Sequence, residues 1–198
     1  MTPHRQLDTL ECSAAAFLLL PLLIFFASWL RWPWALALLG LAALSSWAVL
    51  RQRQPVSGPP LGPRVSALMA GAALLWVLLS GLLGPLALNT DWFVRLAVLR
   101  DLSRGAWPVG YGAVDGGDLM LRFSLGYYVV PALAGKLLGD GAARLALGLC
   151  TSLGVLLFFA LAVGASTVRR AGPVAAWLLL LIAFSGMDVL GYRVETGL

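Results

Sequence analysis

Ionisable side chains are scarce in this sequence, and the carboxylate best placed for chemistry is that of Asp91. The 198 residues contain nine Asp and Glu, fourteen Lys and Arg, two Cys and one His. Asp91 follows a long apolar stretch and precedes a segment of mixed composition, so we expect it at a boundary between apolar and aqueous surroundings. There it could act as a general base that takes a proton from a hydroxyl group. The alternative is structural, because Asn89, Thr90 and Asp91 are all residue types that cap helices.

Arg122, Lys136 and Asp188 are the candidate substrate-binding residues. Arg122 and Lys136 flank the uncharged stretch 123–135, and a basic side chain at such a position either extends to lipid headgroups or binds an anionic phosphate. Asp188 lies near the end of the last apolar stretch. An acid within an apolar segment indicates function unless it reaches the interface, where charge costs little. Both interpretations stay open for all three residues.

The His and Cys content excludes several kinds of site. His4 is the single histidine, so this chain cannot build a bis-His haem site, an HExxH zinc site or a Ser-His-Asp triad. Cys12 and Cys150 are expected at different depths and have no CxxC partner, which argues against a disulfide. The residues by themselves therefore support no metal site, and whether the protein uses a divalent metal stays open.

The composition predicts an integral membrane protein. Apolar residues make up 60% of the chain and charged residues 12%, against about 25% charged in soluble domains, and the mean hydropathy is +0.88. These values exclude a water-soluble domain, a disordered chain and a collagen-like fibre, and they predict an all-α polytopic membrane helix bundle. The net charge of +5 does not predict nucleic-acid binding, because the basic residues lie between apolar stretches.

Five apolar stretches fall within the range of about 17–25 residues that a membrane-spanning helix needs. They are residues 13–30, 32–50, 65–88, 145–168 and 173–190. The first is interpreted as a retained helix, because Asp8 and Glu11 precede it where a signal peptide would be basic. Residues 123–135 are short and contain Pro131, so we predict a re-entrant or interfacial segment.

The distribution of arginines predicts the orientation in the membrane. The 51–64 loop holds three arginines and the 169–172 loop holds two, with no acid in either, so the positive-inside rule places both loops in the cytoplasm. Five spans then leave the N-terminus in the cytoplasm and put the 89–144 loop and the C-terminus outside, in a multi-pass protein of the cell (inner) membrane. A sixth span at 123–135 would move Arg169 and Arg170 outside, so the charges favour five.

The outer loop is predicted to begin with an amphipathic surface helix at 91–104. Trp92, Leu96 and Leu99 recur at helical spacing on one face, and charged residues occupy the other. We expect an ion pair between Asp101 and Arg104 on that charged face.

The residues after this helix are predicted to be irregular. Gly105 ends the helix, and Trp107-Pro108 turns the chain. Residues 110–117, GYGAVDGG, are interpreted as a Gly-rich loop. Because no strand precedes them and the GxxxxGK[ST] pattern is missing, they do not predict a phosphate-binding P-loop.

The order of motifs over residues 91–145 resembles the first outer loop of the GT-C membrane glycosyltransferases. That loop carries an acid at the exit of a span, an amphipathic helix, a turn with Trp and Pro, a Pro-bearing apolar segment, and K-x-x-G and a-x-R-L patterns before the next span. The matching residues are Asp91, the helix to Arg104, Gly105-Ala106-Trp107-Pro108, Gly126-Tyr127-Tyr128-Val129-Val130-Pro131, Lys136-Leu137-Leu138-Gly139 and Ala143-Arg144-Leu145.

The resemblance implies an extracytoplasmic active site, where sugar passes from a polyprenyl-phosphate donor to an acceptor. Asp91 would be the loop acid that activates the acceptor or, as in some members, helps to bind a divalent metal. Arg122 and Lys136 would be donor-phosphate candidates, and Asp188 lies on the same outer side. Family members carry more than five spans, so the resemblance implies that this chain acts as the N-terminal part of such an enzyme or with a partner subunit.

The chain is expected to have two parts. Residues 1–64 would form an N-terminal transmembrane hairpin with its cytoplasmic connector, and residues 65–198 a GT-C-like transmembrane core with the outer loop at 89–144. The alternatives to an enzyme are a non-catalytic membrane scaffold, which would pair through its Gly-lined helix faces, and a transporter subunit. A transporter needs ionisable groups deep within its spans, and the centres of the first four predicted spans have none.

Overall fold

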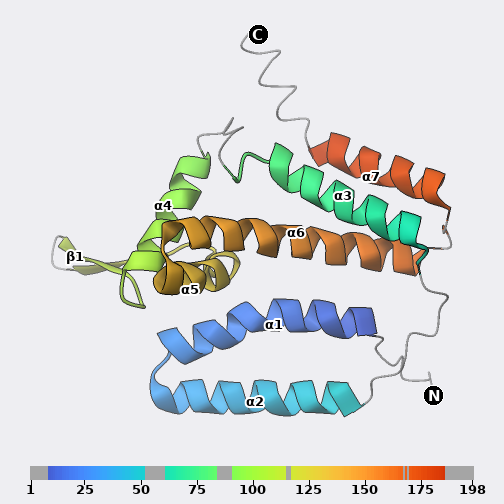
Figure 1. The fold of residues 1–198 in the computed structure, drawn as a ribbon. Coiled ribbons are helices and arrows are strands. Elements are labelled where there is room, and N and C mark those ends of the chain that lie inside the picture. The colour runs from blue at the N-terminus through green and yellow to red at the C-terminus, as the bar shows by residue number, and fades with distance from the viewer. Residues whose placement is uncertain are drawn as a thin grey trace, which may run out of the picture. The chain divides into compact units, whose positions relative to one another are not determined.

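The computed structural model describes residues 9–51, 61–83, 91–114, 117–166, 168 and 170–185, which are mostly helical (Figure 1). Contacts divide the chain into two compact units: unit 1 comprises residues 1–57 and 93–147, and unit 2 comprises residues 58–92 and 148–198. The elements are α1 (Thr9–Trp29), α2 (Trp32–Arg51), α3 (Pro63–Leu79), α4 (Asp91–Arg104), β1 (Gly110–Val114), β2 (Gly117–Met120), the 3-10 turn η1 (Leu125–Tyr127), α5 (Val129–Leu138), α6 (Asp140–Ala165) and α7 (Ala171–Ser185).

Three of these helices are long and apolar enough to cross a membrane. They are α1 with 21 residues, α2 with 20 and α6 with 26, and at about 1.5 Å per residue each reaches the roughly 30 Å of a hydrocarbon core. The predicted spans at 65–88 and 173–190 correspond to α3 and α7, which have 17 and 15 residues. The far ends of those two predicted spans, 84–88 and 186–190, lie outside the described residues.

The side chains of α2 show why such a helix suits lipid. Ala35 is its one buried residue, while Leu36, Leu41 and Leu44 are each more than 60% exposed. Exposed apolar surface of this extent is disfavoured in water and favourable against acyl chains.

Residues 123–135 do not form a long helix. They contain the short turn η1 and most of α5, whose ten residues rise about 15 Å, half of the hydrocarbon core. Pro131 is the third residue of α5, within the first turn, where its missing N–H breaks no intrahelical hydrogen bond. The prediction that this segment does not span as a single helix agrees with α5.

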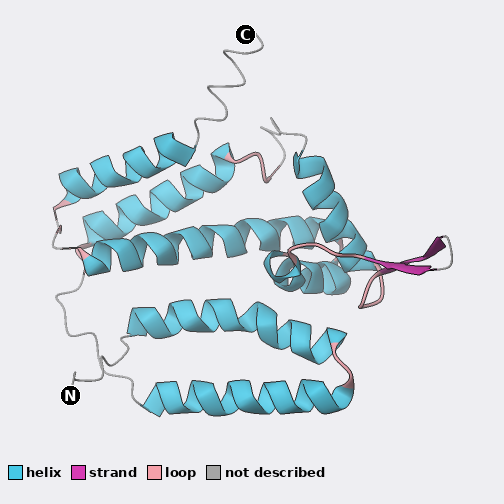
Figure 2. Cartoon of the chain, turned by 180° about the vertical axis from the view of Figure 1, so that it is seen from behind, coloured by secondary structure: helices cyan, strands magenta, loops and turns pink. Residues whose placement is uncertain are grey.

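Part of the predicted Gly-rich loop is a β-hairpin, so the prediction of irregular structure at 110–117 is wrong there. Strands β1 and β2 pair antiparallel with an irregular register between Gly110 and Ala113 (Figure 2). Gly112, inside the irregularity, has a φ of +85°, a value that glycine adopts without steric cost. The N–H of Leu121 donates to the carbonyl of Val109 at 2.9 Å and extends the pairing. The pairing of β1 depends on β2 as its partner, and composition alone does not reveal that partner.

Helix α4 has the bounds predicted for the surface helix. Leu99 and Leu102 are buried, whereas Arg100 and Arg104 are exposed, as the amphipathic spacing predicts for these four residues. The helix ends at Gly105 as predicted: the Gly105 N–H donates to the carbonyl of Asp101 at 2.7 Å. A Cβ on Gly105 would lie 2.8 Å from that carbonyl oxygen.

Gly135 sets the packing of α4, α5 and α6 within unit 1. A Cβ added at Gly135 would lie 2.8 Å from the Cβ atoms of both Ser103 and Ala143. Ser103 is buried, and its hydroxyl is satisfied by donating to the Leu99 carbonyl at 2.7 Å. Only glycine therefore lets α5 approach these two helices so closely.

Aromatic rings attach α1 to the segment after α4. Trp29 stacks on Phe25, with ring centroids 5.3 Å apart, and lies 4.9 Å from the ring of Trp107. The indole N–H of Trp107 donates to the carbonyl of Leu102 at 2.7 Å. This contact fixes the turn that the sequence placed at Trp107-Pro108.

The core of unit 2 lies among α3, α7 and the later part of α6. Its buried residues are all apolar: Val65, Met69, Ala73, Phe159, Val163, Val174 and Leu178.

Candidate functional site

An open cavity of about 500 Å³ lies in unit 1, where α4 meets the beginning of α6. It is the place in this unit where charged side chains gather around a concave surface. The lining residues are Phe93, Leu96, Ala97, Leu99, Arg100, Asp101, Ser103, Arg104, Asp140, Ala143 and Arg144. We call this set the arginine cavity, because three arginines lie on its wall.

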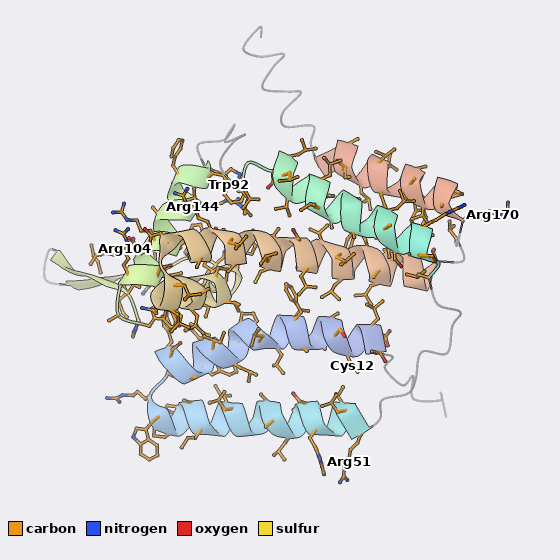
Figure 3. All side chains as sticks on the ribbon, viewed as in Figure 1. Cys12, Arg51, Trp92, Arg104, Arg144 and Arg170 are labelled. Carbon is orange, nitrogen blue, oxygen red and sulfur yellow. The ribbon has the colours of Figure 1, made fainter. Side chains whose placement is uncertain are left out.

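Helical periodicity explains how residues distant in sequence meet here. On α4, residues 93, 97, 100 and 104 are spaced by three and four positions and share one face. On α6, Asp140 and Arg144 are four positions apart and share a face in the first two turns. Figure 3 shows Arg104 and Arg144 together at the end of α6 that lies against α4.

Arg104 forms an ion pair with Asp140 across the two helices. Its Nε donates to Oδ1 at 3.3 Å, and a terminal nitrogen donates to Oδ2, so the guanidinium engages both carboxylate oxygens. The hydrogen bond from Arg104 to Asp140 and the attraction between their charges raise the Arg104 pKa above its already high value. Both side chains are about half exposed, so the pair orients the guanidinium more than it stabilises the fold.

The predicted ion pair between Asp101 and Arg104 is not formed. The Asp101 carboxylate instead accepts a hydrogen bond from the Tyr111 hydroxyl at 2.6 Å. That hydrogen bond raises the Tyr111 pKa, with smaller contributions from partial burial and the Asp101 charge. Arg104 pairs with Asp140 because a bidentate interaction between two helices has better hydrogen-bond geometry than a contact between two side chains on one exposed helix face.

Arg100 and Arg144 are the cations that the cavity leaves available. Both side chains are exposed, and neither makes a hydrogen bond or ion pair with any residue in the described part of the chain. Arg104 is held by its carboxylate partner, Asp140. A guanidinium offers a planar fork of N–H donors that matches the oxygens of a phosphate, so the cavity is suited to an anion.

Phe93 gives the same wall an apolar end. Its ring is 71% exposed, and it lies on the face of α4 that carries Arg100 and Arg104. The cavity therefore combines cationic and apolar surface, as a ligand with an anionic group and a hydrocarbon part requires.

Asp91 does not line the arginine cavity. It is the first residue of α4, and Arg100 follows it by nine positions, which correspond to two and a half turns. The two side chains therefore leave opposite faces of the helix. An acid at this position suits the positive end of the helix dipole.

The other predicted site residues also lie away from the arginine cavity or outside the described residues. Arg122 is exposed and does not line the cavity. Lys136 donates a hydrogen bond to the Gly105 carbonyl, and its ammonium lies 4.9 Å from the centre of the Trp107 ring. Lys136 thus caps the carboxyl end of α4. Asp188 lies outside the described residues.

No group of three or more His, Cys, Asp or Glu side chains in the described part of the chain is arranged to hold a metal ion. Asp101 and Asp140, the two acids of the cavity, are each engaged by a neighbouring donor.

Sequence reasoning did not single out Arg100, Arg104, Arg144 and Asp140 as a site. Arg144 belongs to the Ala143-Arg144-Leu145 pattern of the resemblance, which was the one available signal. The other three show only the spacing of an exposed helix face and an acid at the start of a helix. Their assembly depends on α4 meeting α6, which local patterns do not encode.

Comparisons with protein-family models, with characterised proteins and with solved structures gave no match for this chain.

Proposed function

We propose that this chain is a multi-pass membrane protein that binds the phosphate of a lipid-linked sugar donor and contributes to sugar transfer, as the N-terminal part or a subunit of a GT-C-type glycosyltransferase. The observation that carries the proposal is the arginine cavity. It presents two available guanidinium groups and a third that is held by Asp140.

The ligand chemistry follows from the cavity wall. A phosphate or diphosphate can accept hydrogen bonds from Arg100 and Arg144, because both guanidinium groups are exposed at the same concavity. The exposed ring of Phe93 offers apolar surface to the first part of a polyprenyl chain. Unit 1 also contains residues 93–145 of the family resemblance.

The membrane arrangement that goes with this function has five spans. We propose that the segments containing α3 and α7 cross the membrane in addition to α1, α2 and α6. The N-terminus is then cytoplasmic, and α4, the hairpin and α5 lie at the extracytoplasmic face, with α5 re-entrant or interfacial.

Asp91 is the proposed general base for the acceptor hydroxyl, and Arg122 and Asp188 are secondary candidates for contact with substrate. Lys136 is better assigned to capping α4. Replacing Asp91 by asparagine should abolish transfer from a polyprenyl-phosphate sugar while leaving insertion and yield unchanged, because asparagine caps a helix as well as aspartate. Unchanged transfer by the Asp91→Asn protein would leave Asp91 with the capping role alone.

The binding step is tested separately with polyprenyl phosphate and with polyprenol of the same chain length. The full chain in detergent micelles should bind the phosphate form more tightly than the alcohol. Arg144→Gln and Arg100→Gln should each weaken phosphate binding about tenfold, the size expected for one charge-assisted hydrogen bond. Binding is measured by quenching of tryptophan fluorescence.

Arg31→Gln is the matched control, since it removes an exposed arginine of unit 1 that does not line the cavity. It should bind as the wild type does. Equal losses in the Arg31 and Arg144 variants would show attraction by net charge alone, and the cavity would then not be the phosphate site.

A further inference from the structure

Unit 2 contains a second cavity, of about 640 Å³, between α3 and α7. Apart from Arg64 its lining is apolar, with small residues such as Gly71, Ala72 and Ala175 on its floor. Such residues leave room for a ligand rather than filling the space between the helices. We call it the apolar groove.

The two helices that form the groove run in the same direction. The wall on α3 extends from Arg64 to Leu75, and the wall on α7 extends from Ala171 to Ile182. Figures 1 and 2 show α3 and α7 side by side, with both N-terminal ends at the same end of the pair. Each wall therefore begins at the polar end of its helix and continues into the apolar part.

The N-terminal end of the groove is cationic. Arg64 lines it and is exposed, and Arg170 immediately precedes α7 at the same end (Figure 3). Neither arginine makes an ion pair or hydrogen bond through its side chain with a residue that the structure describes. Neither helix has an acid in its first turn, so nothing in either first turn offsets the positive charge there.

The length of the groove matches one leaflet of a bilayer. The two ends of each wall are eleven positions apart in sequence, which corresponds to about 16 Å of helix. Half of a hydrocarbon core is about 15 Å. A ligand seated here would place an anionic group beside Arg64 and extend an apolar chain of one leaflet's depth.

We propose that the apolar groove binds an anionic phospholipid, with its phosphate at Arg64 and Arg170 and one acyl chain along Gly71 and Ala175. Charge complementarity selects the headgroup, because two guanidinium groups favour a phosphate in a headgroup of net negative charge over one whose charge is offset by a cation. The apolar wall selects an acyl chain over a free phosphate. This site is separate from the arginine cavity and does not depend on the proposed function.

The test is competition between an anionic and a zwitterionic phospholipid, both of which carry a phosphate. The full chain is purified in detergent and exposed to equal amounts of phosphatidylglycerol and phosphatidylcholine with identical acyl chains, and the retained lipid is counted by native mass spectrometry. The wild type should retain phosphatidylglycerol about tenfold more, because the quaternary ammonium of phosphatidylcholine offsets the attraction of its phosphate to the arginines. Arg64→Gln should remove most of this preference, and Arg51→Gln on α2 is the control that leaves it intact.

A second variant tests the groove itself. A Cβ at Gly71 meets no atom within 4 Å, so a side chain there begins in open space. Gly71→Leu should therefore occupy the groove and abolish retention of both lipids. Gly40→Leu is the matched control, because Gly40 on α2 has the same open surroundings. Circular dichroism of each variant checks that it is folded.

Several results would overturn the proposal. Equal retention of the two lipids by the wild type, or an unchanged preference in both Arg64→Gln and Gly71→Leu, would exclude a lipid site here. Competition by glycerol 3-phosphate at the same concentration would show a site for free phosphate. A wild-type dimer that Gly71→Leu converts to a monomer would show that a second copy occupies the groove.

Discussion

Replacing Gly135 by alanine should destabilise unit 1, because this position has no room for a Cβ atom. The added atom would lie 2.8 Å from the Cβ of Ser103 on α4 and from the Cβ of Ala143 on α6, and closer still to the Ser103 hydroxyl oxygen. Neither Cβ can rotate away, since each is fixed to its helix backbone. Helix α5 must therefore move away from both neighbours.

The size of the effect follows from two opposing contributions. Forcing an extra methyl group into a packed interior costs about 1–3 kcal/mol, while alanine is favoured over glycine in a helix by up to about 1 kcal/mol. Gly141→Ala, at the second residue of α6, serves as the reference. It carries only the helix-propensity contribution, because a Cβ there meets no atom within 4 Å. Gly135→Ala should therefore be less stable than Gly141→Ala by about 1–3 kcal/mol.

The free energy of unfolding is measured on the full chain in detergent micelles by titration with sodium dodecyl sulfate. The loss of helix during the titration is monitored by circular dichroism. A second substitution, Ser103→Gly, removes two of the three close contacts and should restore part of the loss in the Gly135→Ala background. The coupling between the two substitutions is read from a double-mutant cycle. If Gly135→Ala unfolds at the same detergent composition as Gly141→Ala, the close approach of α4, α5 and α6 is refuted.

Two further predictions concern hydrogen bonds in unit 1. Because the Asp101 carboxylate raises the Tyr111 pKa, the stabilisation from this bond is fully present below the ordinary tyrosine pKa of about 10 and is lost as pH rises through the raised value. The difference in phenolate absorbance between wild type and Tyr111→Phe should accordingly titrate above about 10. Replacing Lys136 by methionine removes the hydrogen bond to the Gly105 carbonyl and the contact with the Trp107 ring, and should lower the free energy of unfolding by about 1 kcal/mol.

Each of these two predictions has a result that would contradict it. A Tyr111 hydroxyl that titrates at or below the ordinary tyrosine pKa would show that it does not donate a hydrogen bond to the Asp101 carboxylate. Arg122→Met is the control for Lys136→Met, because it also removes an exposed cation from unit 1. Equal stability of those two variants would show that the capping contact of Lys136 contributes nothing.

Local patterns in the sequence determined the helical class and several element bounds. Hydropathy predicted α1, α2 and α6, because a backbone within lipid must satisfy its own hydrogen bonds and does so as a helix. The predicted surface helix at 91–104 has the bounds of α4, since its apolar spacing and the glycine that follows act over only a few residues. The short 123–135 segment was correctly separated from the long helices by its length.

Tertiary structure decided which charges meet. Arg104 pairs with Asp140, thirty-six positions away in sequence, rather than with its neighbour Asp101, because α4 and α6 are brought together at Gly135. The same packing gathers Arg100 and Arg144 around one cavity, while helical geometry turns Asp91 to the other face of α4. Spacing along a chain predicts the face of a helix on which a residue lies. The residue that it meets on a neighbouring helix depends on how the helices pack. In unit 1 that packing depends on Gly135, which has no side chain.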